Sequence, residues 1–348
     1  MDTIEREGGT LETINPEIAR IEQLIKVYVE GSTNPDVRAY WGSGRDARYM
    51  LRKTLKAISM ANMRQVRVLD IGCGFGWDAA LLSFVGGNEV VANDIRPTMT
   101  EVVEERIESA CRAGISGLSV STLLGDVCEI ELEENSFDAV HSSEGIEHVH
   151  DLEKMFSVVR RVLRPGGRGV FFNTSNALHP PTRMETEKMW LERDASHELV
   201  ETLKAERPIE NASIEPYAVM RQRLISEKNP GLSPESIDVL VSATAGLNKK
   251  QIEQLADSYV PGNSLPTRPA LSWCRNPITG EYCERLLDPF EVAGFARKQG
   301  LKARVWHHRF NRMPLTLLNV INGLPLEWVN RLVFRLRPQF AVTVRKAD

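Results

Sequence analysis

The sequence has little cysteine, and its cysteines follow no pattern. Five are scattered over 348 residues, and no two form a CxxC pair. Scarcity and scatter exclude a disulfide-stabilised miniprotein. We expect free thiols in a reducing compartment.

Long apolar runs and an excess of one charge are also absent. No run approaches the about 20 residues that span a bilayer. The acidic, polar N-terminus lacks the basic-then-apolar pattern of a signal peptide, so we expect a cytoplasmic protein. Lys and Arg number 43 against 47 Asp and Glu, a formal net charge of −4. No basic footprint for nucleic acid exists at whole-chain level.

The middle of the chain alternates short β-branched runs with helical patterns. Strands are predicted at 66–71, 89–93, 118–124, 137–141 and 169–173, with helices between them. This alternation indicates a parallel sheet covered by helices. Two further strands are predicted after residue 300, at 301–306 and 340–344. The sequence therefore predicts a doubly wound α/β fold with a seven-stranded, mostly parallel sheet.

Two segments lie outside this alternation. Residues 1–64 carry helical patterns and are predicted to form part of the substrate cover. Residues 176–285 are mainly helical in pattern, have a net charge of −3, and interrupt the α/β domain of residues 65–175 and 286–348. We expect this insertion to form a lid over the substrate.

The most informative stretch is the glycine turn that follows the first predicted strand. It reads Asp70-Ile71-Gly72-Cys73-Gly74-Phe75-Gly76. Glycines at a strand-to-helix turn allow positive φ and close approach of the backbone to a ligand. The dinucleotide fingerprint GxGxxG is not present, and a carboxylate lies two residues before the first glycine. This arrangement disfavours a pyrophosphate and tolerates a cationic ligand.

Further motifs follow in order along the chain. They are Asn93-Asp94-Ile95, Leu124-Gly125-Asp126-Val127, Asn135-Ser136-Phe137-Asp138-Ala139-Val140, Glu144-Gly145-Ile146-Glu147-His148-Val149 and Arg161-Val162-Leu163-Arg164-Pro165-Gly166-Gly167. With the glycine turn, this series resembles the class I S-adenosylmethionine-dependent methyltransferases. It looks closest to the ubiquinone and menaquinone biosynthesis group. The resemblance implies a Rossmann-like methyltransferase fold and S-adenosyl-L-methionine as cofactor.

Candidate cofactor-binding residues lie where the strands end. Asp94, at a strand end, can accept hydrogen bonds from two ribose hydroxyls. Asp126 can accept from the adenine amino group. Asp70 can bind the amino-acid portion through water or orient the turn. The remaining candidates are Gly72, Cys73, Gly74 and Gly76 of the turn, Ile95, Val127, Ser143 and Arg48, the last with Arg45 and Arg52 as rivals.

Methyl transfer to an alcohol is helped by a general base. The candidates are Glu144, His148 and His150, with His307 and His308 as a further pair. No histidine, cysteine or acidic residue shows the spacing of a strong metal signature, so no metal is expected.

The sequence leaves the acceptor open. We expect methyl transfer to a small molecule, most simply to a hydroxyl oxygen of a sugar or other biosynthetic intermediate. A quinone-like or lipid-linked acceptor, a silent cofactor-binding subunit and a nicotinamide-dependent dehydrogenase are the alternatives. The apolar face of 314–340 packs between the last strands, forms a homodimer interface, or lies on a membrane surface.

Overall fold

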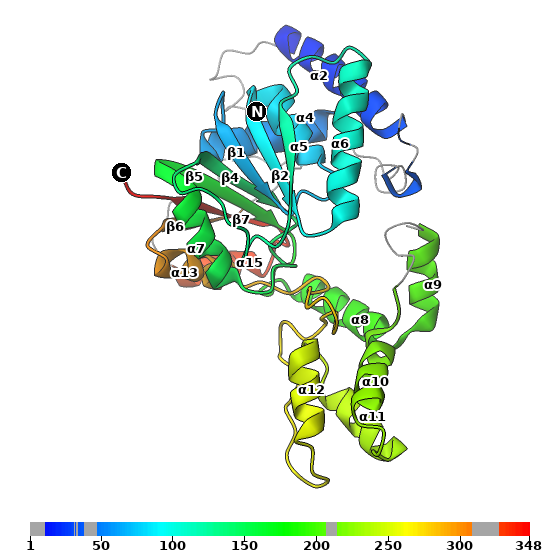
Figure 1. Cartoon of the computed structure of the whole chain (residues 1–348). Helices are drawn as coiled ribbons and strands as arrows, with labels where there is room; N and C mark the ends of the chain where they lie inside the picture. Colours follow the sequence, from blue (N-terminus) through cyan, green and yellow to red (C-terminus); the bar gives the residue numbers. More distant parts are fainter. Residues whose placement is uncertain (1–10, 31, 33, 38–46, 207–213, 308–326) are drawn as a thin grey trace. The chain divides into compact units, whose positions relative to one another are not determined.

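A computed structural model describes residues 11–30, 32, 34–37, 47–206, 214–307 and 327–348 (Figure 1). The chain divides into two compact units. Unit 1 comprises residues 1–146, 151–174 and 289–348, and unit 2 comprises residues 147–150 and 175–288.

Unit 1 is built on a seven-stranded sheet, which confirms the predicted fold class. The strand order is β3-β2-β1-β4-β5-β7-β6. β1 to β5 are parallel, whereas β7 is antiparallel to both β5 and β6. The strand order reverses between β1 and β4, which is where ligands bind in open α/β sheets. The strands are β1 Arg67–Ile71, β2 Glu89–Asp94, β3 Val120–Leu124, β4 Phe137–Ser143, β5 Leu163–Asn173, β6 Lys302–His307 and β7 Phe340–Arg345.

The fifth strand is longer than the sequence pattern predicted. β5 begins at Leu163, directly after helix α7 (Leu152–Val162), and runs through Pro165-Gly166-Gly167. By itself this tripeptide favours a turn, because glycine and proline commonly end regular structure. Leu163 instead pairs with Phe137 of β4, and the register shifts before the next pair, Ala139 with Arg168.

Helices cover both faces of the sheet (Figure 1). α4 (Ala47–Ala61), α5 (Trp77–Gly86) and α6 (Pro97–Arg112) lie on one face, and α7, α13 (Pro289–Lys298) and α15 (Glu327–Phe334) on the other. Small side chains let the helices approach closely: the first face packs Ala57 and Ala79 on Ala92 and Ala139. On the other face Phe156 meets Phe171 edge to face, with ring centroids 5.1 Å apart.

The N-terminal helix contacts the glycine turn. α2 (Leu11–Ile25) continues as a π-helix, η1 (Lys26–Glu30). Tyr28 in η1 is fully buried, and its hydroxyl donates to the carbonyl of Phe75 over 2.7 Å. The N-terminal segment is thereby attached to the glycine turn itself.

Unit 2 is mainly helical and has its own apolar clusters. One cluster surrounds Trp190 and Trp273, whose ring centroids lie 5.5 Å apart, and another surrounds Ile225 and Leu240. Residues 260–284 contain no regular helix. The helices are α8 Pro180–Ala195, α9 His197–Glu206, α10 Tyr217–Lys228, α11 Pro234–Ala243 and α12 Lys249–Asp257.

The apolar segment 314–340 is described only from residue 327. Within that part, Phe334 is 1% exposed and stacks on His307 of β6 at 3.8 Å. Leu332 and Leu336 are exposed. Part of this segment therefore packs on unit 1. Among the described residues no helix is long and apolar enough to cross a membrane.

Candidate functional site

The glycine turn adopts the conformation that its sequence predicted. Gly72, Gly74 and Gly76 have φ values of +67°, +52° and +72°, a region that other residues rarely adopt. A Cβ at Gly72 would lie 3.1 Å from the Cα of Gly145, whereas one at Gly74 would have no neighbour within 4 Å. The backbone at Gly74 is thus open to a ligand.

Asp94 at the end of β2 is bonded to this turn. Its Oδ2 accepts from the backbone N–H of Gly74 over 2.9 Å, and its Oδ1 accepts from that of Arg96 over 3.0 Å. The residue is 5% exposed. Two N–H donors and the neighbouring Arg96 guanidinium, 3.8 Å away, hold the carboxylate in one orientation.

The edge beyond β2 and β3 combines apolar and polar groups. Ile95 is 48% exposed and Leu124 52% exposed, which is unusual for large aliphatic residues. Asp126 accepts from the N–H of Cys128 over 2.8 Å, and Val127 is buried. These residues offer a planar ring an apolar surface to pack against and hydrogen-bonding groups at its edge.

Asp70 has a partner that the sequence did not predict. Its Oδ1 lies 2.7 Å from Nδ1 of His141 on β4, directly opposite in the sheet. Burial raises the pKa of Asp70, and the adjacent His141 opposes this effect. The Asp70 Oδ2 and the Ser143 hydroxyl are buried, and neither has a hydrogen-bond partner among the described residues. The polar run His141-Ser142-Ser143 at the end of a buried strand was the available signal.

Cys73 and Arg48 are the remaining cofactor candidates. Burial, followed by the carboxylates of Asp70 and Asp94, raises the pKa of the Cys73 thiol, so this residue stays protonated at neutral pH. Arg48 belongs to α4, but its side chain lies outside the described part. Its rival Arg52 is exposed, and Arg45 is not among the described residues.

His148 lies in unit 2 within a cluster of charged residues. Its Nδ1 is 2.8 Å from the carbonyl of Tyr282, and its Nε2 is 4.0 Å from Glu147 Oε1 and 3.8 Å from Glu284 Oε1. Burial lowers the pKa of His148, but the two carboxylates and the carbonyl outweigh it and raise the value to about 9. The ring is therefore an imidazolium at neutral pH, and an imidazolium cannot accept a proton.

The same cluster has the residue types of a metal site. One ligand atom from each of Glu147, His148 and Glu284 lies within 4.8 Å of the others. His148 Nε2 faces both carboxylates at ion-pair distance, and we describe the group as an ion-pair cluster.

Glu144 follows β4 with a φ of +53°. Its Oε2 accepts from both the N–H and the hydroxyl of Thr174, over 3.0 and 2.9 Å. Glu144 is exposed, and these two bonds orient its carboxylate. His150 is half-buried, His307 is buried against Phe334, and His308 lies outside the described residues.

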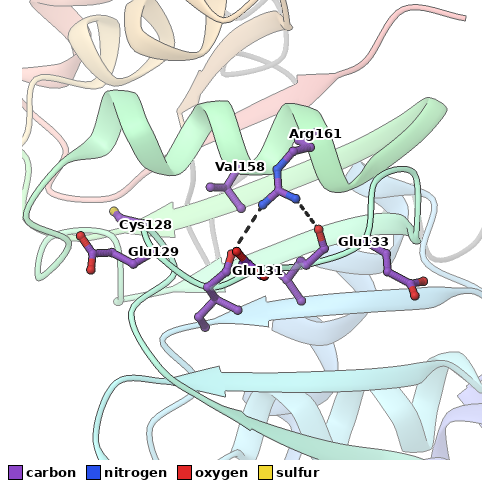
Figure 2. Close-up of a pocket in the computed structure, with 8 residues that line it drawn as sticks. Cys128, Glu129, Glu131, Glu133, Val158 and Arg161 are labelled. Carbon is purple, nitrogen blue, oxygen red and sulfur yellow. Dashed lines mark hydrogen bonds between the residues drawn. The ribbon is translucent and has the colours of Figure 1, made fainter.

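A shallow pocket on unit 1 contains none of the predicted site residues (Figure 2). Arg161 crosses it to bond the carbonyls of Ile130 and Leu132. The acidic side chains of Glu129, Glu131 and Glu133 lie along it. Because no catalytic or cofactor-binding candidate lines it, we do not assign the active site to this pocket.

Comparison with known proteins identifies the class. Residues 69–171 match the family model described as a methyltransferase domain. A sterol 24-C-methyltransferase of Aspergillus fumigatus is 36% identical over 103 residues, which are 29% of this chain and 26% of that protein. A demethylmenaquinone methyltransferase of Staphylococcus aureus is 34% identical over 123 residues, 35% of this chain and 48% of that protein.

A second demethylmenaquinone methyltransferase, from Staphylococcus carnosus, is 28% identical over 164 residues, 47% of this chain and 64% of that protein. The chain thus spans less than two thirds of the length of each of these relatives. Among solved structures, a methyltransferase from Listeria monocytogenes described as S-adenosylmethionine-dependent is 13% identical, with a TM-score of 0.43. The match covers 87% of this chain and all of that one.

The sheet order, the glycine turn and the family match define one class of protein. The chain carries a class I methyltransferase domain, whose cofactor is S-adenosyl-L-methionine. The nicotinamide-dependent dehydrogenase is thereby set aside, in agreement with the absence of GxGxxG.

Proposed function

We propose that this chain transfers the methyl group of S-adenosylmethionine to a small-molecule acceptor. The observation that carries the proposal is the open backbone at Gly74 beside a rigidly held Asp94. A carboxylate in this position suits the two hydroxyls of a ribose.

The residues of unit 1 fit the cofactor in three places. We assign Asp94 to the ribose, and Asp126 with Ile95 and Val127 to the adenine. The unpartnered Asp70 Oδ2 and Ser143 hydroxyl fit the ammonium and carboxylate of the amino-acid portion, because buried polar atoms normally have partners.

Bound S-adenosylmethionine supplies a methyl group already activated on a sulfonium, so this chain need not activate it. The contribution of the protein is to align the acceptor atom with the methyl–sulfur bond and to exclude water. For a hydroxyl acceptor we assign the proton-accepting role to Glu144, because its carboxylate is exposed and oriented by Thr174. His150 is the remaining alternative. His148, as a cation, is assigned an electrostatic role instead.

The acceptor proposed first is a hydroxyl oxygen of a sugar or other biosynthetic intermediate. The names of the relatives favour a second candidate, a quinone-like or lipid-linked acceptor. Residues 176–285 lie outside the matched range, and we propose that they form the lid that selects between such acceptors.

The test has two steps. Calorimetry with S-adenosylmethionine and with NAD measures which cofactor binds. A methyl-labelled assay then measures transfer to a panel of sugars, demethylated quinones and sterols, with Glu144→Gln as the variant that lacks the base. Tight NAD binding without a response to S-adenosylmethionine contradicts the proposal. Cofactor binding without turnover on any acceptor supports a silent subunit instead.

A further inference from the structure

Two cysteines of unit 2 face one another across a short antiparallel hairpin. Arg275 and Tyr282 form an antiparallel bridge, and the N–H of Cys283 donates to the carbonyl of Cys274 over 2.9 Å. On the other side of the bridge, the N–H of Asn276 donates to the carbonyl of Glu281 over 2.8 Å. This register places Cys274 and Cys283 directly opposite each other.

The separation that this register implies suits a disulfide. Directly opposed residues of a hydrogen-bonded antiparallel pair have Cα atoms about 5.5 Å apart. Disulfides most often join Cα atoms about 5.5–6 Å apart. The Cys274 thiol donates to the carbonyl of Trp190 over 3.8 Å. No large backbone movement is required to join the two cysteines.

The surroundings distinguish the two sulfur atoms. Cys274 is buried at 1% exposure, whereas Cys283 is partly accessible. The neighbouring Cys274 thiol lowers the pKa of Cys283, and the charges of Arg193 and His148 add to this effect, whereas burial and Glu284 oppose it. The neighbouring Cys283 and burial raise the pKa of Cys274. Thiolate character is therefore concentrated on the more accessible sulfur, which is the arrangement of a reactive cysteine beside a resolving one.

We propose that Cys274 and Cys283 are a redox modification site that hydroperoxides convert to a reversible disulfide. The Cys283 thiolate attacks the outer peroxide oxygen, the O–O bond breaks, and the alcohol or water leaves with a proton. Cys283 is then a sulfenic acid. The Cys274 sulfur attacks it, the S–O bond breaks, and water leaves with the Cys274 proton. Two thiols are oxidised and one hydroperoxide is reduced, so atoms and electrons balance.

The disulfide would tether a segment that holds two other groups. The carbonyl of Tyr282 lies 2.8 Å from Nδ1 of His148, and the carbonyl of Cys283 accepts from Trp190 Nε1 over 2.7 Å. Oxidation would thus fix covalently the hairpin that positions His148 and contacts the Trp190 cluster.

The test uses the wild-type full chain. The folded protein is treated with increasing hydrogen peroxide, blocked with an alkylating reagent in denaturant, digested without reductant and examined by mass spectrometry. We expect a linked peptide pair containing Cys274 and Cys283 in most molecules, and we expect dithiothreitol to remove it. Exposed Cys111 serves as the internal reference thiol.

Two variants test the order of attack. Cys274→Ser should leave a sulfenic acid on Cys283 that dimedone traps, and Cys111→Ser should leave the linked pair unchanged. The proposal is overturned if both thiols remain fully alkylated at doses that oxidise Cys111. It is also overturned if they are oxidised separately to sulfinic acids without a linked peptide.

Discussion

The Asp70 carboxylate and the His141 imidazole form a buried pair at the ends of β1 and β4, with 2.7 Å between Oδ1 and Nδ1. Each side chain is 2% exposed. A carboxylate at this depth is costly unless a donor is present, because burial removes its solvation. The pair therefore stabilises the end of β1, which the glycine turn follows.

Removing the donor from this pair should destabilise unit 1. His141→Leu replaces the imidazole with an apolar side chain and leaves the Asp70 carboxylate without its partner, and we expect a loss of about 2–4 kcal/mol. Urea unfolding measures this change in the free energy of unfolding. The double variant Asp70→Asn/His141→Leu should lose less than the sum of the single losses, because it buries no unpaired charge. A loss below about 0.5 kcal/mol for His141→Leu, the size of an ordinary surface change, would contradict this account.

Asp94→Ala should weaken S-adenosylmethionine binding by about 10- to 100-fold. The reason is the loss of hydrogen bonds to a charged acceptor, which contribute about 1.5–3 kcal/mol. Calorimetry measures the affinity. Glu101→Gln, an exposed acid on α6, is the matched control and should bind normally. Equal affinities in the two variants would remove the ribose role.

Gly74→Ala and Gly76→Ala should differ in what they disturb. A methyl group at Gly74 meets no protein atom within 4 Å, so it should obstruct the ligand while strain at positive φ costs about 1–2 kcal/mol. A Cβ at Gly76 would lie 2.5 Å from Val103 and 3.0 Å from the Tyr28 hydroxyl, so stability should fall further. Affinity and thermal unfolding are measured together. If Gly74→Ala lowered stability more, and cofactor affinity less, than Gly76→Ala does, Gly74 would not face the cofactor.

The charge on His148 should make unit 2 less stable at alkaline pH. Its pKa rises from 6.5 to about 9 in the folded chain, so its stabilising contribution is complete below 6.5 and lost as pH rises through 9. We expect a loss on the order of 1 kcal/mol, because the side chain is 33% exposed and partly screened. In His148→Gln, the unfolding midpoint should fall less between pH 6.5 and about 9 than it does in the wild type. An unchanged slope would show that another group titrates.

The buried Arg221–Asp194 pair should be essential for unit 2. Two hydrogen bonds of 2.7 and 3.0 Å join the guanidinium to both carboxylate oxygens, and Arg221 Nε also donates to the carbonyl of Val241. Arg221→Met should cost about 3–5 kcal/mol, because it removes both hydrogen bonds to the buried carboxylate and leaves it only the Arg268 guanidinium, 3.7 Å from its Oδ2. The rate of protease cleavage within residues 175–288 of the full chain measures this loss. Exposed Arg223→Met is the control, and equal protease resistance in both variants would refute the prediction.

Local patterns in the sequence were sufficient for much of the fold. The β-branched runs before Gly72 and Asp94 predicted β1 and β2, because alternating strands and helices impose a parallel sheet. Asn248 caps α12 through a capping box with Gln251, which depends only on residues three apart. Gly72, Gly74 and Gly76 have positive φ because the turn is encoded within a few residues. β5 differed because its partner in β4 outweighed the local preference of Pro165-Gly166-Gly167 for a turn.

What the sequence determined by itself was the succession of strands and helices along an α/β domain and the positions of Asp70, Asp94 and Asp126 near the strand ends. Only the tertiary structure decided which groups face one another. The pairing of Asp70 with His141 depends on strand register, and the protonation of His148 depends on Glu284, which is distant in sequence. Interaction energies between charges depend on distance and burial, and neither quantity can be read from spacing along the chain.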